Sequence, residues 1–235
     1  MHARREQGFT LLELLIVIAI IAILSVILVI VINPAETLKK SRDAQRISDL
    51  NTMKTALGIY ITSTATPDLD ASVSNFCLGT GITTAQIGYS AEIADTTCAV
   101  NVVEGNDITS GTTFNASDMC RYVGTTGAAA IDGTGWVPVN LGGLVGGSPI
   151  SNLPLDPVNT VATAGTPTST DLVYRYACQN AAAGNKPSYV FEFNAQLESA
   201  AYTSDDNRKT KDGGDNDNYY EVGSSLRLIG TGTNF

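Results

Sequence analysis

The chain of 235 residues is short of the side chains on which most enzymes rely. Its only histidine is His2, and 14 basic residues stand against 23 acidic ones, for a formal charge of −9. A chain without histidine beyond position 2 cannot build Ser-His-Asp or Cys-His catalysis, nor a histidine metal site. Two carboxylates would suffice for glycoside cleavage, but no pair stands out. We therefore expect no enzyme activity, and the acidic charge argues against general nucleic-acid binding.

One long apolar run dominates the sequence, from Phe9 to Ile32. Its only ionisable residue is Glu13, and its other polar residues are Thr10 and Ser25. A helix of ~20 apolar residues is long enough to cross a bilayer. Because the run is apolar on all sides, the helix should be buried all round, in lipid or among copies of itself. A plain signal anchor is the alternative interpretation.

The residues before the run indicate its orientation. Arg4 and Arg5 outweigh Glu6, so the basic end should stay in the cytoplasm and the rest of the chain should be exported. A secretory signal would be cut after the apolar segment, behind small residues, and none is evident in the bulky stretch 25–32. A cut, if there is one, therefore falls before the helix.

The start of the run resembles the prepilin motif of type IV pilins and their relatives, carried by Gly8, Phe9, Thr10, Leu11, Leu12 and Glu13. The resemblance implies cleavage between Gly8 and Phe9 by a prepilin peptidase and methylation of the new amine on Phe9. It also implies assembly with itself and other pilins by an inner-membrane machinery. The chain would be a single-pass cytoplasmic membrane protein first, and part of a cell-surface or periplasmic filament later.

The presence of a carboxylate, Glu13, in such an apolar segment needs a physical explanation. A charge at the centre of a membrane helix costs ~2.5 to 3.5 kcal/mol, but Glu13 lies only about 6 Å below Phe9, close to the interface. In a filament it would need a cation, and a free amine on Phe9 would be protonated at neutral pH. The amine of a neighbouring subunit, which the resemblance favours, and the amine of the same chain both remain open.

The helix should continue beyond the membrane as an amphipathic segment over 33–61, bent or restarted at Pro34. We expect its charges to form a solvated face: Glu36, Lys39, Lys40, Arg42, Asp43, Arg46 and Asp49. A nucleic-acid site there is the weaker alternative. This helix, partly in the membrane and partly half-buried, is similar to the long N-terminal helix of pilins, although the helix-breaking proline of that family usually falls about one turn earlier.

The remainder, 62–235, should form one exported head after a leader (1–8), a transmembrane and assembly helix (9–32) and the amphipathic continuation (33–61). Two alternating runs, 172–178 and 189–198, predict paired strands whose apolar faces could cover the helix. Further short strands are expected near 99–103, 136–141 and 225–229. The fold class is α+β, a long N-terminal helix packed against a small antiparallel sheet, which resembles the pilin fold.

Four cysteines follow the membrane segment: Cys77, Cys98, Cys120 and Cys178. In an exported chain they predict two disulfides, for which three connectivities exist. The pairing Cys77–Cys98 with Cys120–Cys178 is preferred, because the first closes a local loop. A zinc site is the rival interpretation, but no Cys-x-x-Cys spacing supports it.

An acidic segment near the end of the chain is a candidate calcium site. Asp215, Asp217 and Glu221 could supply several of the six to eight oxygens that calcium takes, although the spacing is not that of an EF-hand. This segment and the Leu-Pro-x-Asp-Pro sequence at 153–157 resemble the major pseudopilin of type II secretion systems, whose late loop binds calcium. A solvated acidic turn without a cofactor is the alternative.

The sequence is therefore compatible with two classes of function. The first is a structural subunit of a type IV pilus or pilus-like filament, with a type II secretion pseudopilin as its variant. The second is a membrane-tethered exported binding domain, in which Glu13 would have no role in assembly.

Overall fold

The computed structural model describes residues 8–70, 76–78, 85–92, 120–123, 126–162, 167–180 and 188–230. The chain divides into two compact units, Met1–Lys39 and Lys40–Phe235. The helices are α1 (Leu11–Ile32), α2 (Pro34–Ser63) and the short π-helix η1 (Ala201–Asp205). The strands are β1 (Ile87–Glu92), β2 (Cys120–Val123), β3 (Tyr174–Gln179), β4 (Val190–Ala195) and β5 (Tyr220–Gly223).

Asn33 separates the two long helices. Its backbone is left-handed, with φ of 44°, a conformation that ends a helix and that asparagine adopts more readily than most residues. Pro34 then begins α2, at the one helical position where a missing N–H costs nothing. The N–H groups of Glu36 and Thr37 donate to the Asn33 carbonyl at 3.1 and 3.2 Å. The prediction that the helix restarts at Pro34 is confirmed.

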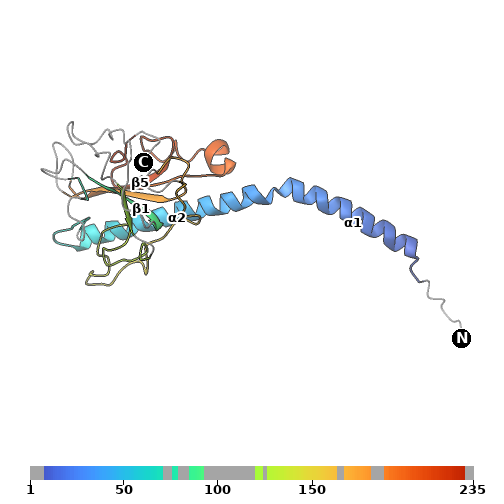
Figure 1. Ribbon diagram of the computed structural model, residues 1–235, viewed down its shortest axis with the longest axis horizontal. Coiled ribbons are helices and arrows are strands. Elements are labelled where there is room, and N and C mark those ends of the chain that lie inside the picture. Colours follow the sequence, from blue (N-terminus) through green and yellow to red (C-terminus); the bar gives the residue numbers. More distant parts are fainter. Residues whose placement is uncertain are drawn as a thin grey trace. The chain divides into compact units, whose positions relative to one another are not determined.

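The second unit contains a five-stranded sheet in the order β2-β1-β3-β4-β5 (Figure 1). Strand β3 pairs antiparallel with both β1 and β4, and β4 pairs antiparallel with β5. Strand β2 runs parallel to β1 at the edge. The α+β class with an antiparallel sheet is therefore confirmed, and β3 and β4 are the two strands predicted from alternation.

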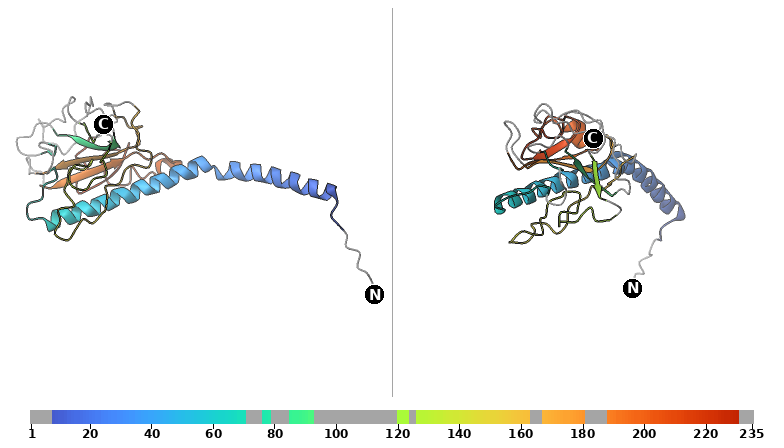
Figure 2. Two further views of the ribbon diagram at one scale, coloured as in Figure 1. Left: turned by 60° about the horizontal axis from the view of Figure 1, so that its bottom comes forward. Right: turned by 60° about the vertical axis from the view of Figure 1, so that its left-hand side comes forward.

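Helix α2 runs along one face of this sheet (Figure 2). The apolar residues of β3 and β4 that were predicted to share a face do so, and they form the main core with the helix. That core includes Leu50, Met53, Ala56, Leu57 and Tyr60 from α2, and Tyr174, Tyr176, Cys178, Phe191, Phe193 and Ala195 from the strands. Trp136 packs on Tyr174 and Phe193, with ring centroids 6.1 and 5.8 Å apart.

The opposite face of the sheet is covered partly by the C-terminal segment. Leu228 and Ile229 are buried there, and their N–H groups donate to Glu192 Oε2 of β4 at 2.6 and 3.1 Å. The predicted strand at 225–229 is therefore wrong, because these N–H groups bind a side chain instead of a neighbouring strand. The last strand of the sheet is β5, a few residues earlier.

The predicted strand at 136–141 is also wrong. Its apolar side chains are buried, but the backbone folds back on nearby residues: Trp136 N–H donates to the Ala128 carbonyl and Leu141 N–H to the Val139 carbonyl. Trp136, Val137, Val139 and Leu141 are thus buried without forming a strand ladder. The strand predicted at 99–103 lies outside the described residues.

One disulfide lies within the described chain, and it joins Cys77 to Cys178. The preferred pairing of Cys77 with Cys98 and of Cys120 with Cys178 is therefore wrong. Leu78 pairs with the end of β3, donating to the Cys178 carbonyl at 2.8 Å and accepting from Asn180 N–H at 2.9 Å, so the neighbouring Cys77 meets Cys178. This contact spans 101 residues and no spacing rule predicts it. Cys98 lies outside the described residues, as does the side chain of Cys120.

Candidate processing and assembly site

The Gly8–Phe9 junction lies directly before α1. The Phe9 side chain is 86% exposed. A side chain added at Gly8 would meet nothing within 4 Å, and the Gly8 backbone does not have a positive φ. Neither crowding nor backbone conformation therefore requires glycine at this position. Among the described residues, nothing in the fold explains glycine at this position.

Thr10 and Glu13 form a capping box at the start of α1. Glu13 N–H donates to Thr10 Oγ1 at 3.3 Å, and Glu13 Oε2 accepts from the Thr10 N–H at 2.8 Å and its hydroxyl at 2.9 Å. Helix N-termini leave N–H groups unsatisfied and favour a negative charge in the first turn. The carboxylate that interrupts the apolar run therefore stabilises the beginning of the helix.

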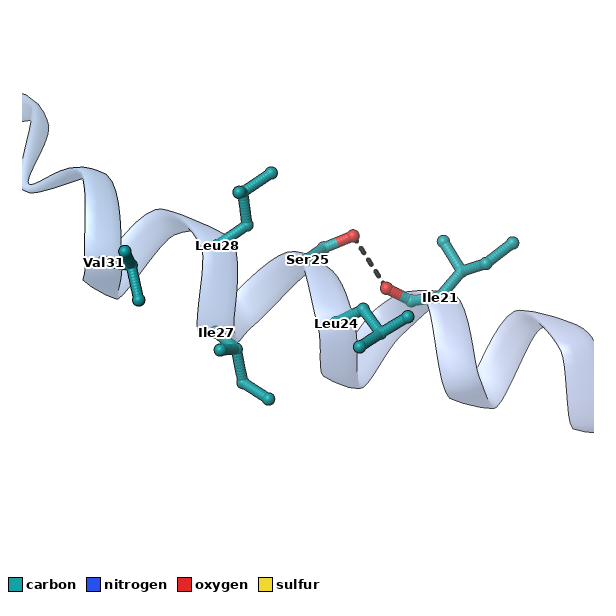
Figure 3. Close-up of a pocket in the computed structure, with 6 residues that line it drawn as sticks. All are labelled: Ile21, Leu24, Ser25, Ile27, Leu28 and Val31. Atoms are coloured by element: carbon teal, nitrogen blue, oxygen red, sulfur yellow. Dashed lines mark hydrogen bonds between the residues drawn. The ribbon is translucent and has the colours of Figure 1, made fainter.

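Among the described residues of the first unit, no side chain of α1 is buried. It is the part of the described chain that is long and apolar enough to cross a membrane. Figure 3 shows a shallow hollow on the helix, lined by Ile21, Leu24, Ser25, Ile27, Leu28 and Val31. The Ser25 hydroxyl donates to the Ile21 carbonyl at 2.7 Å, so this polar group is satisfied within the helix. The whole surface of α1 is available to lipid or to other helices.

The sequence predicted a solvated charged face on α2, and for its central charges this is wrong. Arg46 and Asp43 are fully buried. The Arg46 guanidinium donates to both oxygens of Asp156 at 2.6 and 3.0 Å, to Asp43 at 2.7 Å and to Glu198 at 2.9 Å. Arg42 also donates twice to Glu198. We call these five residues the Arg46 cluster.

The hydrogen bonds of the Arg46 cluster favour the charged forms of Arg46 and Glu198. Burial alone would lower the pKa of Arg46, but its bonds to Asp156, Glu198 and Asp43 outweigh burial and raise that pKa. Hydrogen bonds from Arg42, and then from Arg46, lower the pKa of Glu198. The cluster therefore joins α2 to two distant segments through buried ion pairs. Asp43 and Arg46 are spaced i, i+3 on the helix, but no local signal in the sequence identifies Asp156 and Glu198 as partners.

The three candidate calcium ligands differ in their surroundings. Asp217 is exposed, Asp215 is half-buried, and Glu221 is buried on β5, where its Oε2 accepts from Asn216 N–H at 3.0 Å. Within the described ranges, no three or more histidine, cysteine or acidic side chains are grouped so that they could hold a metal ion. Calcium binding by these residues stays a prediction.

These features define an α+β protein with an apolar N-terminal helix that fits a membrane anchor. A family model described as the prokaryotic N-terminal methylation motif matches residues 3–29. The chain therefore carries the type IV pilin and prepilin signature, which is typical of structural proteins that polymerise and are processed by a prepilin peptidase. No curated protein and no solved structure matches the chain significantly.

Proposed function

We propose that this chain is a structural subunit of a type IV pilus or pilus-like filament, cut between Gly8 and Phe9 and polymerised through α1. The observation that carries the proposal is the open Gly8–Phe9 junction, followed at once by the Thr10–Glu13 capping box. Because the fold gives no reason for glycine at position 8, recognition by a peptidase supplies one.

Cleavage would change the charge at the start of α1. The new amine on Phe9 would be largely protonated at neutral pH, and it would lie four residues before Glu13 on an otherwise uncharged helix. In the bilayer, both groups would sit near the interface. Among packed helices, Glu13 would need a cation, and the Phe9 amine of a neighbouring copy would provide it. Pairing between copies would then set the stagger of the helices.

The processing step is tested by mass spectrometry of the mature N-terminus, with methylated Phe9 as the expected result. The matched variant is Gly8→Leu, whose added side chain has free space and should leave the fold intact. We expect this variant to keep its leader. An N-terminus elsewhere in the wild-type protein, or normal cleavage of Gly8→Leu, would contradict the proposal.

The assembly step is tested with Glu13→Val. This variant should still be cut and inserted in the membrane, but should form few filaments. Normal filaments of this variant would contradict the pairing of Glu13 with the amine of a neighbouring copy.

A pseudopilin of a type II secretion system is the second candidate, favoured by the Leu-Pro-x-Asp-Pro sequence at 153–157. Deletion of the gene would then abolish secretion of folded proteins and leave surface pili unchanged. Loss of surface pili with normal secretion would support the pilus.

A further inference from the structure

Three segments of the head meet at Asn180, directly after β3. Its side-chain oxygen accepts from Leu69 N–H at 2.7 Å, and its amide group donates to Asp68 at 2.8 Å and also to Asp70. Asp70 Oδ2 accepts from Cys77 N–H at 2.8 Å. The two carboxylates therefore connect the segment after α2 with the end of β3 and with the segment that carries Cys77.

This junction lies over the disulfide. Cys77, Cys178 and Leu69 are all buried, and the Leu69 carbonyl oxygen lies 3.8 Å from Cys178 Sγ. The same carbonyl accepts from the Tyr176 hydroxyl at 3.3 Å. Movement of 68–70 away from Asn180 would therefore remove the Leu69 carbonyl from Cys178 Sγ and open one side of the disulfide.

The charges at this junction are not balanced. Asp68 and Asp70 lie side by side, and in the described part of the chain neither forms a salt bridge. Among the described residues, the hydroxyls of Tyr60 and Tyr176 also face this junction, and burial raises the pKa of Tyr176. Burial, and then the hydrogen bond and charge of Asp68, raise the pKa of Asp70 to about 6.

We propose that Asp68 and Asp70 form a proton-dependent cover over the Cys77–Cys178 disulfide. When Asp70 is protonated, its carboxyl group can donate to Asp68 while still accepting from Cys77 N–H. When Asp70 is ionised, two adjacent carboxylates repel each other and the cover opens more often. Because folding raises the affinity of Asp70 for its proton, the cover is fully stabilised below about pH 4 and weakens as the pH rises through 6.

The experiment measures how fast a water-soluble trialkylphosphine reduces this disulfide in the full-length protein. The phosphine gains an oxygen atom from water as the disulfide becomes two thiols. The matched control is Asp70→Asn, whose amide can donate to Asp68 at every pH. The reactivity of the phosphine itself depends on pH. Dividing each wild-type rate by the variant rate at the same pH removes this dependence.

We expect this ratio to be about one near pH 5 and about ten near pH 7.5, after allowing for partial solvent screening. Asp68→Asn removes the other carboxylate of the pair and with it the repulsion of Asp70. The disulfide of this variant should also be reduced more slowly than that of wild type near pH 7.5. A wild-type to Asp70→Asn ratio that is the same at both pH values would overturn the proposal. If Asp70→Asn alone fails to fold, equal rates for wild type and Asp68→Asn would overturn it.

Discussion

Glu13 accepts two hydrogen bonds from Thr10, one from the backbone N–H at 2.8 Å and one from the hydroxyl at 2.9 Å. The carboxylate is therefore satisfied at the start of α1 before any cleavage or assembly. Cutting after Gly8 leaves the Thr10 N–H in place. A second partner for Glu13, such as an amine on Phe9, would add to the capping box and need not replace it.

The capping box and the assembly role of Glu13 can be separated with Thr10→Val. This variant removes the hydroxyl but keeps the carboxylate and the Thr10 backbone N–H. A lost N-cap costs about 1 kcal/mol of helix stability, which the membrane environment can absorb. We expect Thr10→Val to form filaments close to the wild-type level when they are counted by electron microscopy, whereas Glu13→Val should lose most of them. Equal losses in both variants would assign the effect of Glu13 to helix capping alone.

Removing the guanidinium at the centre of the Arg46 cluster should strongly destabilise the head. Arg46→Met leaves Asp43 and Asp156 buried without their cation, and breaking a buried pair in this way costs about 3–5 kcal/mol. Trp136 is the only tryptophan and is fully buried, so its fluorescence during denaturation in detergent reports the free energy of unfolding.

Arg42→Met is the matched control for Arg46→Met. Arg42 binds the same Glu198, but its side chain is about one-third exposed. A salt bridge with this much solvent access should contribute far less to stability than the buried pairs of Arg46. Similar losses in the two variants would show that burial of the Arg46 cluster does not determine its stability.

The Cys77–Cys178 disulfide should stabilise the head by restricting the unfolded chain. A bridge between residues 101 apart is expected to contribute about 3–5 kcal/mol. We expect the double variant Cys77→Ala, Cys178→Ala to lose about this much, measured by denaturation of the full-length protein. Digestion without reduction should yield a linked peptide that contains both cysteines. A peptide linking Cys77 to Cys98 would contradict the structure.

The head should be more stable in mild acid than in mild alkali. Burial raises the pKa of Glu221 to about 7, and burial next to Glu221 raises that of Glu192 further. Folding therefore increases proton binding by this pair. The resulting stability is complete below about pH 4.5 and is lost as the pH rises through 7, a change of about 1–3 kcal/mol.

Measurements of the free energy of unfolding at about pH 5 and pH 8 test whether stability falls as the pH rises. Glu221→Gln keeps an oxygen for Asn216 N–H but cannot ionise, so its stability should change less than that of wild type over the same range. A wild-type protein that becomes more stable as the pH rises would contradict the raised pKa values of Glu192 and Glu221.

The sequence predicted the elements whose signals are local. The apolar run identified α1, Asn33-Pro34 marked the break, and alternation located β3 and β4. Long-range pairing was missed for a physical reason. The partners of Arg46 lie 110 and 152 residues away, and a charged helix face looks the same in sequence whether water or carboxylates surround it. The irregular chain at 136–141 was mistaken for a strand because its apolar side chains are buried, as those of β3 and β4 are.

The Arg46 cluster also fixes how α2 can move. A helix that contacts a sheet only through apolar side chains can slide or turn by small steps at little cost, because such contacts have no direction. Rotation by one residue, about 100°, would carry Arg46 out of reach of the two Asp156 oxygens. A force applied along the axis of α2 would therefore act on these ion pairs at an early stage. The head would then move together with the helix.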